Sequence, residues 1–307
     1  MSTDQQITRR QFIQHTTACG ATAVAAAGGV QDLSAAEKVS DVQHQQRWQL
    51  GCWTRPWASR AYQVAMDEIA DAGFNYIALT GAKTRTGRVI AAATTVEEAQ
   101  QVGEEARNRG LHITHVYGGG QSLHEGSKKL KKMIDNVQAA RAQSVVLTRF
   151  GNQETYEACI RSAIEGCQYA AKKNITITIK PHGGMIGSGP LLRQAVQKIN
   201  QPGLEIMYDP GNIFFYSDGK VDPVDDCVSV RGLVRSISIK DYQHPKNVTL
   251  TPGTGQVRFP TLFTRLKQGG FHGGPVMIEM VSSGDTQHTR TEVIKTRKYL
   301  EALLGIN

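Results

Sequence analysis

The chain has 307 residues, of which 40% are hydrophobic and 20% are charged, as in an ordinary globular domain. This composition excludes a disordered chain, no apolar run reaches the roughly 18 residues of a membrane helix, and five cysteines are too few for a disulfide scaffold. The formal net charge of +8 favours anionic partners in general. The densest basic cluster, at residues 128–132, has no interleaved aromatic residues on which bases could stack, so we expect no nucleic-acid partner.

Residues 1–36 resemble a twin-arginine export signal. Arg9 and Arg10 precede Phe12 and Ile13, a stretch rich in Ala and Gly follows at residues 18–30, and Ser-Ala-Ala at residues 34–36 suits a signal peptidase. We therefore expect a twin-arginine signal peptide, export to the periplasm and no stable membrane anchor after the signal is cleaved.

A polar linker at residues 37–47 precedes eight short β-branched runs, each followed by a helical stretch with apolar residues three or four positions apart. The runs begin near Gln49, Asn75, Leu111, Ser144, Ile175, Leu204, Val234 and Pro275. Eight such units predict an α/β fold, a single (β/α)8 TIM barrel over residues 48–307. A doubly wound open sheet is the alternative, but no glycine-rich phosphate fingerprint follows the first strand.

Charged side chains are predicted at the carboxyl ends of the strands, where the active sites of such barrels lie. Because alternate side chains of a strand face the lumen, the residues expected to converge at the mouth of the barrel are Lys180, Asp209, Lys240 and Glu279, with His182 just beyond. Buried charges are costly unless they are paired or bind a metal. The cluster therefore indicates a functional site, with salt bridges that close the barrel top as the alternative.

Five segments at these strand ends, in this order, resemble the xylose isomerase-like barrel family of sugar phosphate isomerases and epimerases. They are Ile-Lys-Pro-His-Gly-Gly at residues 179–184, Tyr-Asp-Pro-Gly-Asn at 208–212, Ile-Lys-Asp at 239–241, Gly-Thr-Gly-Gln-Val at 253–257 and Gly-Gly-Pro-Val-Met-Ile-Glu at 273–279. The resemblance implies a TIM barrel that acts on a carbohydrate.

The resemblance also implies a divalent metal, Mn2+, Mg2+ or Zn2+, held by carboxylates and one histidine at the strand ends. Asp209 and Glu279 match two of the ligand positions, and His182 is either a third ligand or a substrate contact. Hard cations accept carboxylate and imidazole ligands. The sequence departs from the family at two customary ligand positions, where Lys180 replaces a glutamate and Ser238 replaces a histidine.

These departures leave two roles open for Lys180. Beside a cation, its pKa would fall because like charge disfavours the ammonium, and the lysine would then act as a general base. Alternatively, Lys180 and Lys240 replace the metal, serving as fixed positive charges that stabilise an enediolate oxyanion.

The remaining residues at the mouth suit a polyol. Substrate contacts are expected from Trp53, His115, Arg149, Asn212, Lys240 and Asp241. Trp53 ends the first strand and offers an aromatic face to a sugar ring, unless it is a core residue. The stretch at residues 241–259 is too long for an ordinary loop, and we expect it to form a lid or a decorated rim.

These features predict a sugar isomerase or epimerase that acts on a ketose or keto-sugar, with a homo-oligomer compatible with the sequence. Lys180 or Glu279 would take a proton next to the carbonyl, giving an enediolate. Two alternatives stay open: a lyase or deglycosidase that cleaves keto-glycosides by β-elimination, and a sugar-binding barrel without catalysis. A DNA-repair endonuclease is disfavoured, because Asn212 stands where a histidine would be expected and the chain is predicted to be exported.

Overall fold

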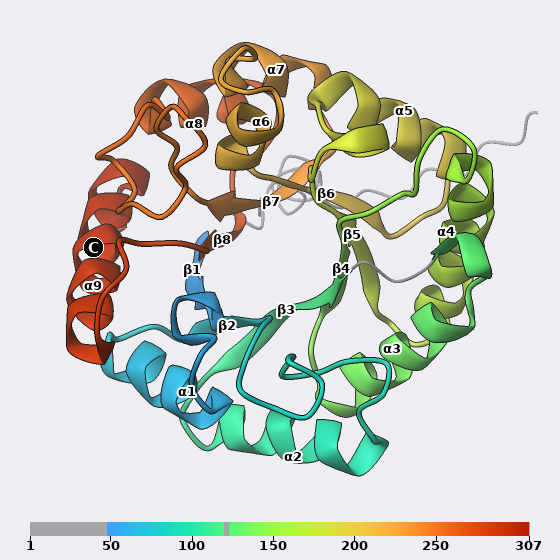
Figure 1. Ribbon diagram of the computed structural model, residues 1–307, viewed down its shortest axis with the longest axis horizontal. Helices are drawn as coiled ribbons and strands as arrows, with labels where there is room; N and C mark the ends of the chain where they lie inside the picture. Colours follow the sequence, from blue (N-terminus) through green and yellow to red (C-terminus); the bar gives the residue numbers. More distant parts are fainter. Residues whose placement is uncertain (1–47, 120–122, 307) are drawn as a thin grey trace, which may run out of the picture. The chain divides into compact units, whose positions relative to one another are not determined.

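A closed barrel of eight parallel strands forms the centre of the structure (Figure 1). This computed structural model describes residues 48–119 and 123–306. Consecutive strands are neighbours, and β8 closes the barrel against β1. The predicted (β/α)8 fold is therefore confirmed. The predicted signal peptide (1–36) and linker (37–47) lie outside the described residues.

Each strand begins within one residue of its predicted start. The strands are β1 Trp48–Trp53, β2 Tyr76–Leu79, β3 His112–Gly119, β4 Ser144–Leu147, β5 Thr176–Ile179, β6 Leu204–Tyr208, β7 Val234–Ile239 and β8 Gly274–Ile278. β5 reads Thr-Ile-Thr-Ile, and such β-branched residues suit a strand that is covered on both faces.

Helices surround the strands, as Figure 1 shows. They are α1 Tyr62–Asp71, α2 Val96–Arg107, α3 Lys128–Ala139, α4 Tyr156–Ala171, α5 Gly189–Ile199, α6 Pro210–Tyr216, α7 Pro223–Asp226, α8 Phe259–Gln268 and α9 Thr286–Leu304. α2 begins at a capping box, in which Thr95 and Glu98 satisfy each other's backbone N–H groups. Within the described part of the chain, no helix combines the length and apolarity needed to cross a bilayer.

Two separate groups of buried side chains stabilise the barrel. The larger one lies between the strands and the surrounding helices and contains most of the buried aliphatic residues. The smaller one consists of Trp53, Ala78, Val146, Met207 and Met277. Because alternate side chains of a strand face opposite ways, this second group fills the lumen and forms the floor beneath the carboxyl ends of the strands.

The alternation that the sequence predicted along β5 and β6 fixes which side chains reach the mouth. Thr178 of β5 contacts Ser144 of β4 through their hydroxyl oxygens, 2.6 Å apart. Met207 of β6 belongs to the lumen group, so Asp209, two residues later, points to the same side. The polar end of the lumen is therefore built from residues that directly follow the strands.

Candidate active site

Four charged side chains meet at the carboxyl end of the barrel. Lys180 follows β5, Asp209 follows β6, Lys240 follows β7 and Glu279 follows β8, and all four are buried. We call these four residues the charged cluster. The structure thus brings together residues that lie far apart in the chain, because the ends of parallel strands meet at one rim.

Two lysine ammonium groups bridge two carboxylates within the charged cluster. Lys180 Nζ lies 2.7 Å from Asp209 Oδ2 and 2.5 Å from Glu279 Oε2. Lys240 Nζ lies 3.0 Å from Asp209 Oδ2 and 3.1 Å from Glu279 Oε1. Burial alone would lower the pKa of Lys180, but the two carboxylates outweigh burial and raise it. For Lys240 burial prevails and the pKa is lowered, so Lys240 is the more easily deprotonated of the two.

Glu279 is held by four donors and remains ionised. Besides the two lysines, Arg55 Nη1 lies 2.5 Å from Oε1, and Ser238 donates its hydroxyl to Oε2 at 2.5 Å. Burial alone would raise the pKa of Glu279, but the charges of Lys180, Lys240 and Arg55 hold it well below its usual range. Both carboxylate oxygens of Glu279 are engaged by these donors, which leaves it poorly placed to take a proton.

The divalent metal implied by the family resemblance does not fit this donor arrangement. Asp209 and Glu279 share two ammonium groups in the space between them, so a metal ion bound by both carboxylates would face two positive charges at close range. His182, the predicted third ligand, is instead hydrogen-bonded to Tyr216. Across residues 48–119 and 123–306, no three His, Cys, Asp or Glu side chains are arranged to hold a metal ion.

A cavity of about 280 Å³ opens beside the charged cluster, and we call it the mouth cavity. Lys180 and Glu279 reach it from the cluster, together with His182. Of the predicted substrate contacts, Trp53 and Arg149 also line it. Its volume is close to the lower end of the range of ligand pockets, roughly 300–1,000 Å³, which suits a small molecule.

His182 is an uncharged polar group that lies beside these charges in the mouth cavity. Its Nδ1 lies 2.8 Å from the hydroxyl of Tyr216, which ends α6. Burial lowers the pKa of His182 to about 4, helped by the charges of Lys180 and Lys240. The imidazole is therefore neutral at neutral pH and is able to accept a proton.

Gly183 lets the chain pass close to Tyr216 directly after His182. Its φ of +75° lies in the left-handed region, and a Cβ there would come within 2.5 Å of Tyr216 Cδ1. Any larger residue would push Tyr216 away from the imidazole. The glycine directly after His182 thus has a local structural reason.

Trp53 and His115 form one layer at the floor of the mouth cavity. Their ring centroids are 6.3 Å apart and tilted by 33°. His115 is buried, its Nδ1 lies 3.0 Å from Thr114 Oγ1, and burial lowers its pKa to about 3. The indole N–H of Trp53 is buried without a hydrogen-bond partner in the described residues. Trp53 therefore offers a donor as well as an aromatic face, whereas His115 supports it without lining the cavity.

Asn212, another predicted substrate contact, points into the protein. Its Nδ2 donates to the carbonyl oxygen of Pro181 at 2.6 Å, and its backbone N–H donates to Asp209 Oδ1 at 2.9 Å, where Asp209 caps the N-terminus of α6. Asn212 therefore holds the backbone next to His182, and we assign it to the support of the loop and not to the substrate.

Asp241 also serves the protein backbone and not the mouth cavity. Its buried carboxylate accepts the backbone N–H groups of Tyr242, Gly253, Gly255 and Val257 at 2.8–3.0 Å. The long stretch after β7 is thus folded around this one side chain. The predicted substrate contact of Asp241 is replaced by a structural role, since both carboxylate oxygens are already occupied.

Three residues of the site were not predicted from the sequence. Arg55 lies two residues after Trp53, the last residue of β1, so the alternation of side chains at the strand end would have pointed to it. Arg88 lies in the loop between β2 and α2, and Tyr216 lies at the end of α6, where no strand alternation orients a side chain. Arg55 and Arg88 line the mouth cavity, and Tyr216 orients His182.

Comparisons with known proteins agree with this architecture. A family model described as a xylose isomerase-like TIM barrel matches residues 66–303. The search of curated proteins found no match. Among solved structures, a xylose isomerase domain protein from Planctomyces limnophilus has 18% identity and a TM-score of 0.67, covering 84% of this chain and 97% of that one.

Two further structures are similar over most of the chain. D-allulose 3-epimerase from Methylomonas sp. has 15% identity and a TM-score of 0.67, covering 84% of this chain and 99% of that one. The 3-keto-D-glucoside 4-epimerase from E. coli has 16% identity and a TM-score of 0.60, covering 82% and 100%. At these identities the structures establish the fold. The family match covers most of the chain, which therefore belongs to the xylose isomerase-like TIM barrel family.

Proposed function

We propose that this protein is a sugar isomerase or epimerase that acts on a keto-sugar through an enediolate, with lysines where its relatives would place a metal. The observation that carries the proposal is the ammonium group of Lys180, fixed between Asp209 and Glu279 at the edge of a cavity that also contains the neutral His182. The sugar epimerases among the structural neighbours support the general class of reaction.

The residues of the mouth cavity supply a proton acceptor and fixed positive charge. His182 takes the proton from the carbon next to the substrate carbonyl, and the electron pair of the broken C–H bond moves to the carbonyl oxygen. Lys180 and Arg55 stabilise the resulting oxyanion. Protonation of the same carbon from its other face gives an epimer. Protonation of the former carbonyl carbon, with transfer of the proton of the neighbouring hydroxyl to the oxyanion, moves the carbonyl to that neighbour and gives an isomer.

These roles differ from the ones predicted from sequence for physical reasons. A general base must be free to take a proton, but Lys180 is a stabilised ammonium and Glu279 accepts four hydrogen bonds or ion pairs. Of the two readings of Lys180, its geometry favours the fixed positive charge. Lys240 acts only through Asp209 and Glu279, because it contacts both carboxylates and does not line the cavity.

The proposal is tested by proton exchange with solvent. Purified protein is incubated in D2O with a panel of neutral and anionic keto-sugars, and deuterium at the carbon next to the carbonyl is measured by NMR. We expect exchange that is unaffected by a chelator. His182→Gln should slow it by about 10²–10⁴-fold and Lys180→Met by about 10²–10³-fold. His272→Gln, at an exposed position before β8, is the matched control.

The outcomes separate the alternatives. Exchange that persists in both variants would remove His182 and Lys180 from the mechanism, and exchange that stops with the chelator would contradict the lysine-based site. Release of an aglycone from a keto-glycoside without any epimer would identify a lyase. Binding of a keto-sugar without exchange or cleavage would identify a sugar-binding barrel.

A further inference from the structure

The mouth cavity carries more positive charge than its own acidic residue balances. Its charged lining consists of Arg55, Arg88, Arg149, Lys180 and Glu279. Four cations and one carboxylate give a formal charge of +3, while Lys240 and Asp209 behind them cancel. A partly enclosed cavity with such an excess attracts anions, because its low-dielectric walls focus the field.

Arg88 and Arg149 are the two cations of this lining whose charge is not neutralised by an ion pair within the described residues. Arg55 and Lys180 are already paired with Glu279. Neither Arg88 nor Arg149 forms an ion pair with any residue in 48–119 or 123–306. A guanidinium is well suited to bind a carboxylate or phosphate through two parallel hydrogen bonds.

Arg88 is held in place before any ligand binds. The hydroxyls of Thr84 and Thr86 donate to its backbone carbonyl oxygen at 2.6 Å and 3.1 Å. Its guanidinium lies 4.5 Å from the centre of the Tyr117 ring, and its Nη1 donates to Thr80 Oγ1 at 3.4 Å. Such preorganisation reduces the entropy that binding must overcome.

Tyr117 also connects Arg88 to Arg149. Its hydroxyl lies 3.0 Å from the hydroxyl of Thr148, the buried residue that precedes Arg149. Arg149 itself is exposed and is near enough to Tyr216 to lower the pKa of that hydroxyl, although burial outweighs this effect. The two arginines therefore lie on the side of the mouth cavity formed by β2, β3 and β4.

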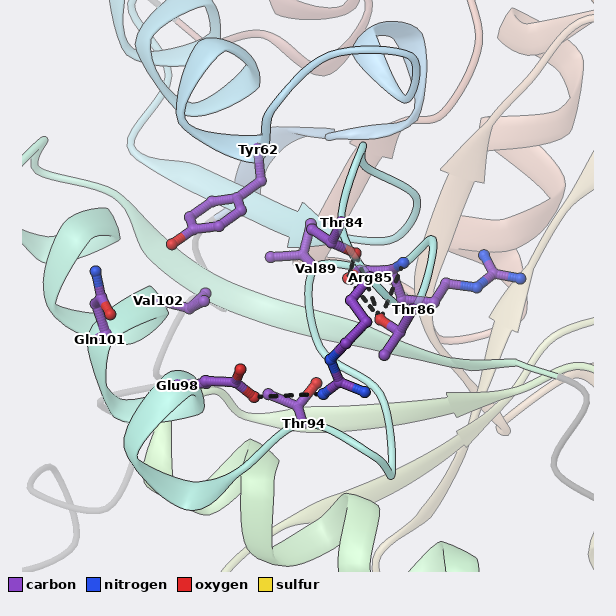
Figure 2. A pocket seen from close by; sticks show the side chains of 10 residues that line it. Tyr62, Thr84, Arg85, Thr86, Val89, Thr94, Glu98, Gln101 and Val102 are labelled. Atoms are coloured by element: carbon purple, nitrogen blue, oxygen red, sulfur yellow. Dashed lines mark hydrogen bonds and ion pairs between the residues drawn. The ribbon is translucent and has the colours of Figure 1, made fainter.

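A neighbouring cavity of about 200 Å³ provides a contrast (Figure 2). It lies between α1, α2 and the loop after β2 and is lined by Tyr62, Arg85 and Glu98 among others. As Figure 2 shows, Arg85 points toward Glu98, with their charged atoms 4.0 Å apart. Arg85 is therefore paired with an acid in this cavity, whereas Arg88, which lines both cavities, forms no ion pair within the described residues.

We propose that Arg88 and Arg149 bind an oxyanion group of the substrate, so that the protein acts on a keto-sugar bearing a carboxylate or a phosphate. That the bound anion is the substrate rests on the proposed function. The preference of the cavity for anions depends only on the two arginines. Lys180 and His182, which follow the neighbouring strand β5 and also line the mouth cavity, then face the carbonyl end of the same molecule.

Calorimetric titration of the purified protein tests the inference without requiring turnover. The probes are D-fructose, 5-keto-D-gluconate and D-fructose 6-phosphate, six-carbon keto-sugars that are respectively neutral, a carboxylate and a phosphate ester. We expect at least one anionic probe to bind about tenfold or more tightly than D-fructose, and which one does so distinguishes a carboxylate from a phosphate. Raising the salt concentration should reduce this preference.

Variants show whether the two arginines cause the preference. Arg88→Gln and Arg149→Gln should each weaken binding of the preferred anion by about tenfold while D-fructose binding stays the same. Arg161→Gln, at an exposed position on α4, is the matched control. Equal binding of all three probes, absence of binding by all three, or a preference that survives in the Arg88→Gln/Arg149→Gln variant would overturn the inference. An anion preference without proton exchange would refute the proposed reaction and leave this inference standing.

Discussion

Replacing Lys240 with methionine tests whether the charged cluster behaves as one interdependent unit. Lys240 is 2% exposed and contacts Asp209 at 3.0 Å and Glu279 at 3.1 Å. Methionine preserves the length of the side chain but leaves both buried carboxylates with one cation fewer. Removing one partner of a buried ion pair costs about 3–5 kcal/mol. At about 2–4 °C per kcal/mol for a domain of this size, Tm should fall by roughly 6–20 °C.

The assay is thermal unfolding followed by circular dichroism, with urea unfolding as a second measure. Lys220→Met, at an exposed position, is the control and should change Tm by less than about 2 °C. In the Lys240→Met/Asp209→Asn variant a negative charge leaves with the positive one, and the asparagine oxygen can still accept the N–H that caps α6. We expect this variant to recover more than half of the loss. Equal Tm values for Lys240→Met and Lys220→Met would refute the reasoning.

The remaining predictions concern acid stability and export. Burial lowers the pKa of His115 to about 3, whereas an unfolded histidine titrates near pH 6.5, so folding stability is present above about pH 6.5 and is lost as pH falls toward 3. Between pH 7 and pH 5 His115 contributes about 2 kcal/mol to this loss, in addition to the contribution of His182, whose pKa is lowered to about 4. Urea unfolding at both pH values should show a difference that His115→Phe reduces by about this amount, and an unchanged difference would contradict the assigned burial. We also propose export by the twin-arginine route to the periplasm; Arg9→Lys/Arg10→Lys should retain the precursor in the cytoplasm by cell fractionation, and unchanged periplasmic yield would disprove it.

Strand periodicity predicted the barrel and its charged cluster, because both follow from rules that act along the backbone. Lys180, Asp209, Lys240 and Glu279 each follow a strand with its lumen-facing register intact. What periodicity does not determine is how the side chains pair. Lysine at position 180 stands in a ligand position of the family, yet only the three-dimensional distances show that its ammonium bridges both carboxylates.

Residues in loops were predicted less well than residues in strands. The sequence predicts a substrate contact for Asp241, but adjacent residues of a strand end point in opposite directions, and its carboxylate accepts backbone N–H groups instead. Asn212 is turned inward by the start of α6, which brings its side chain to the carbonyl of Pro181. Arg88 belongs to an irregular loop, whose conformation depends on hydroxyl contacts that no periodic pattern encodes.

The position of Asp241 separates what must stay constant in this protein from what is free to vary. Its carboxylate organises the following segment through backbone N–H groups alone, so the side chains between its contact points carry little of the folding information. Residues 243–247, whose side chains are exposed, are therefore the most open to substitution, while the preceding Lys240 keeps its place. Such a layout lets the exposed part of this loop change without disturbing the buried charges beneath.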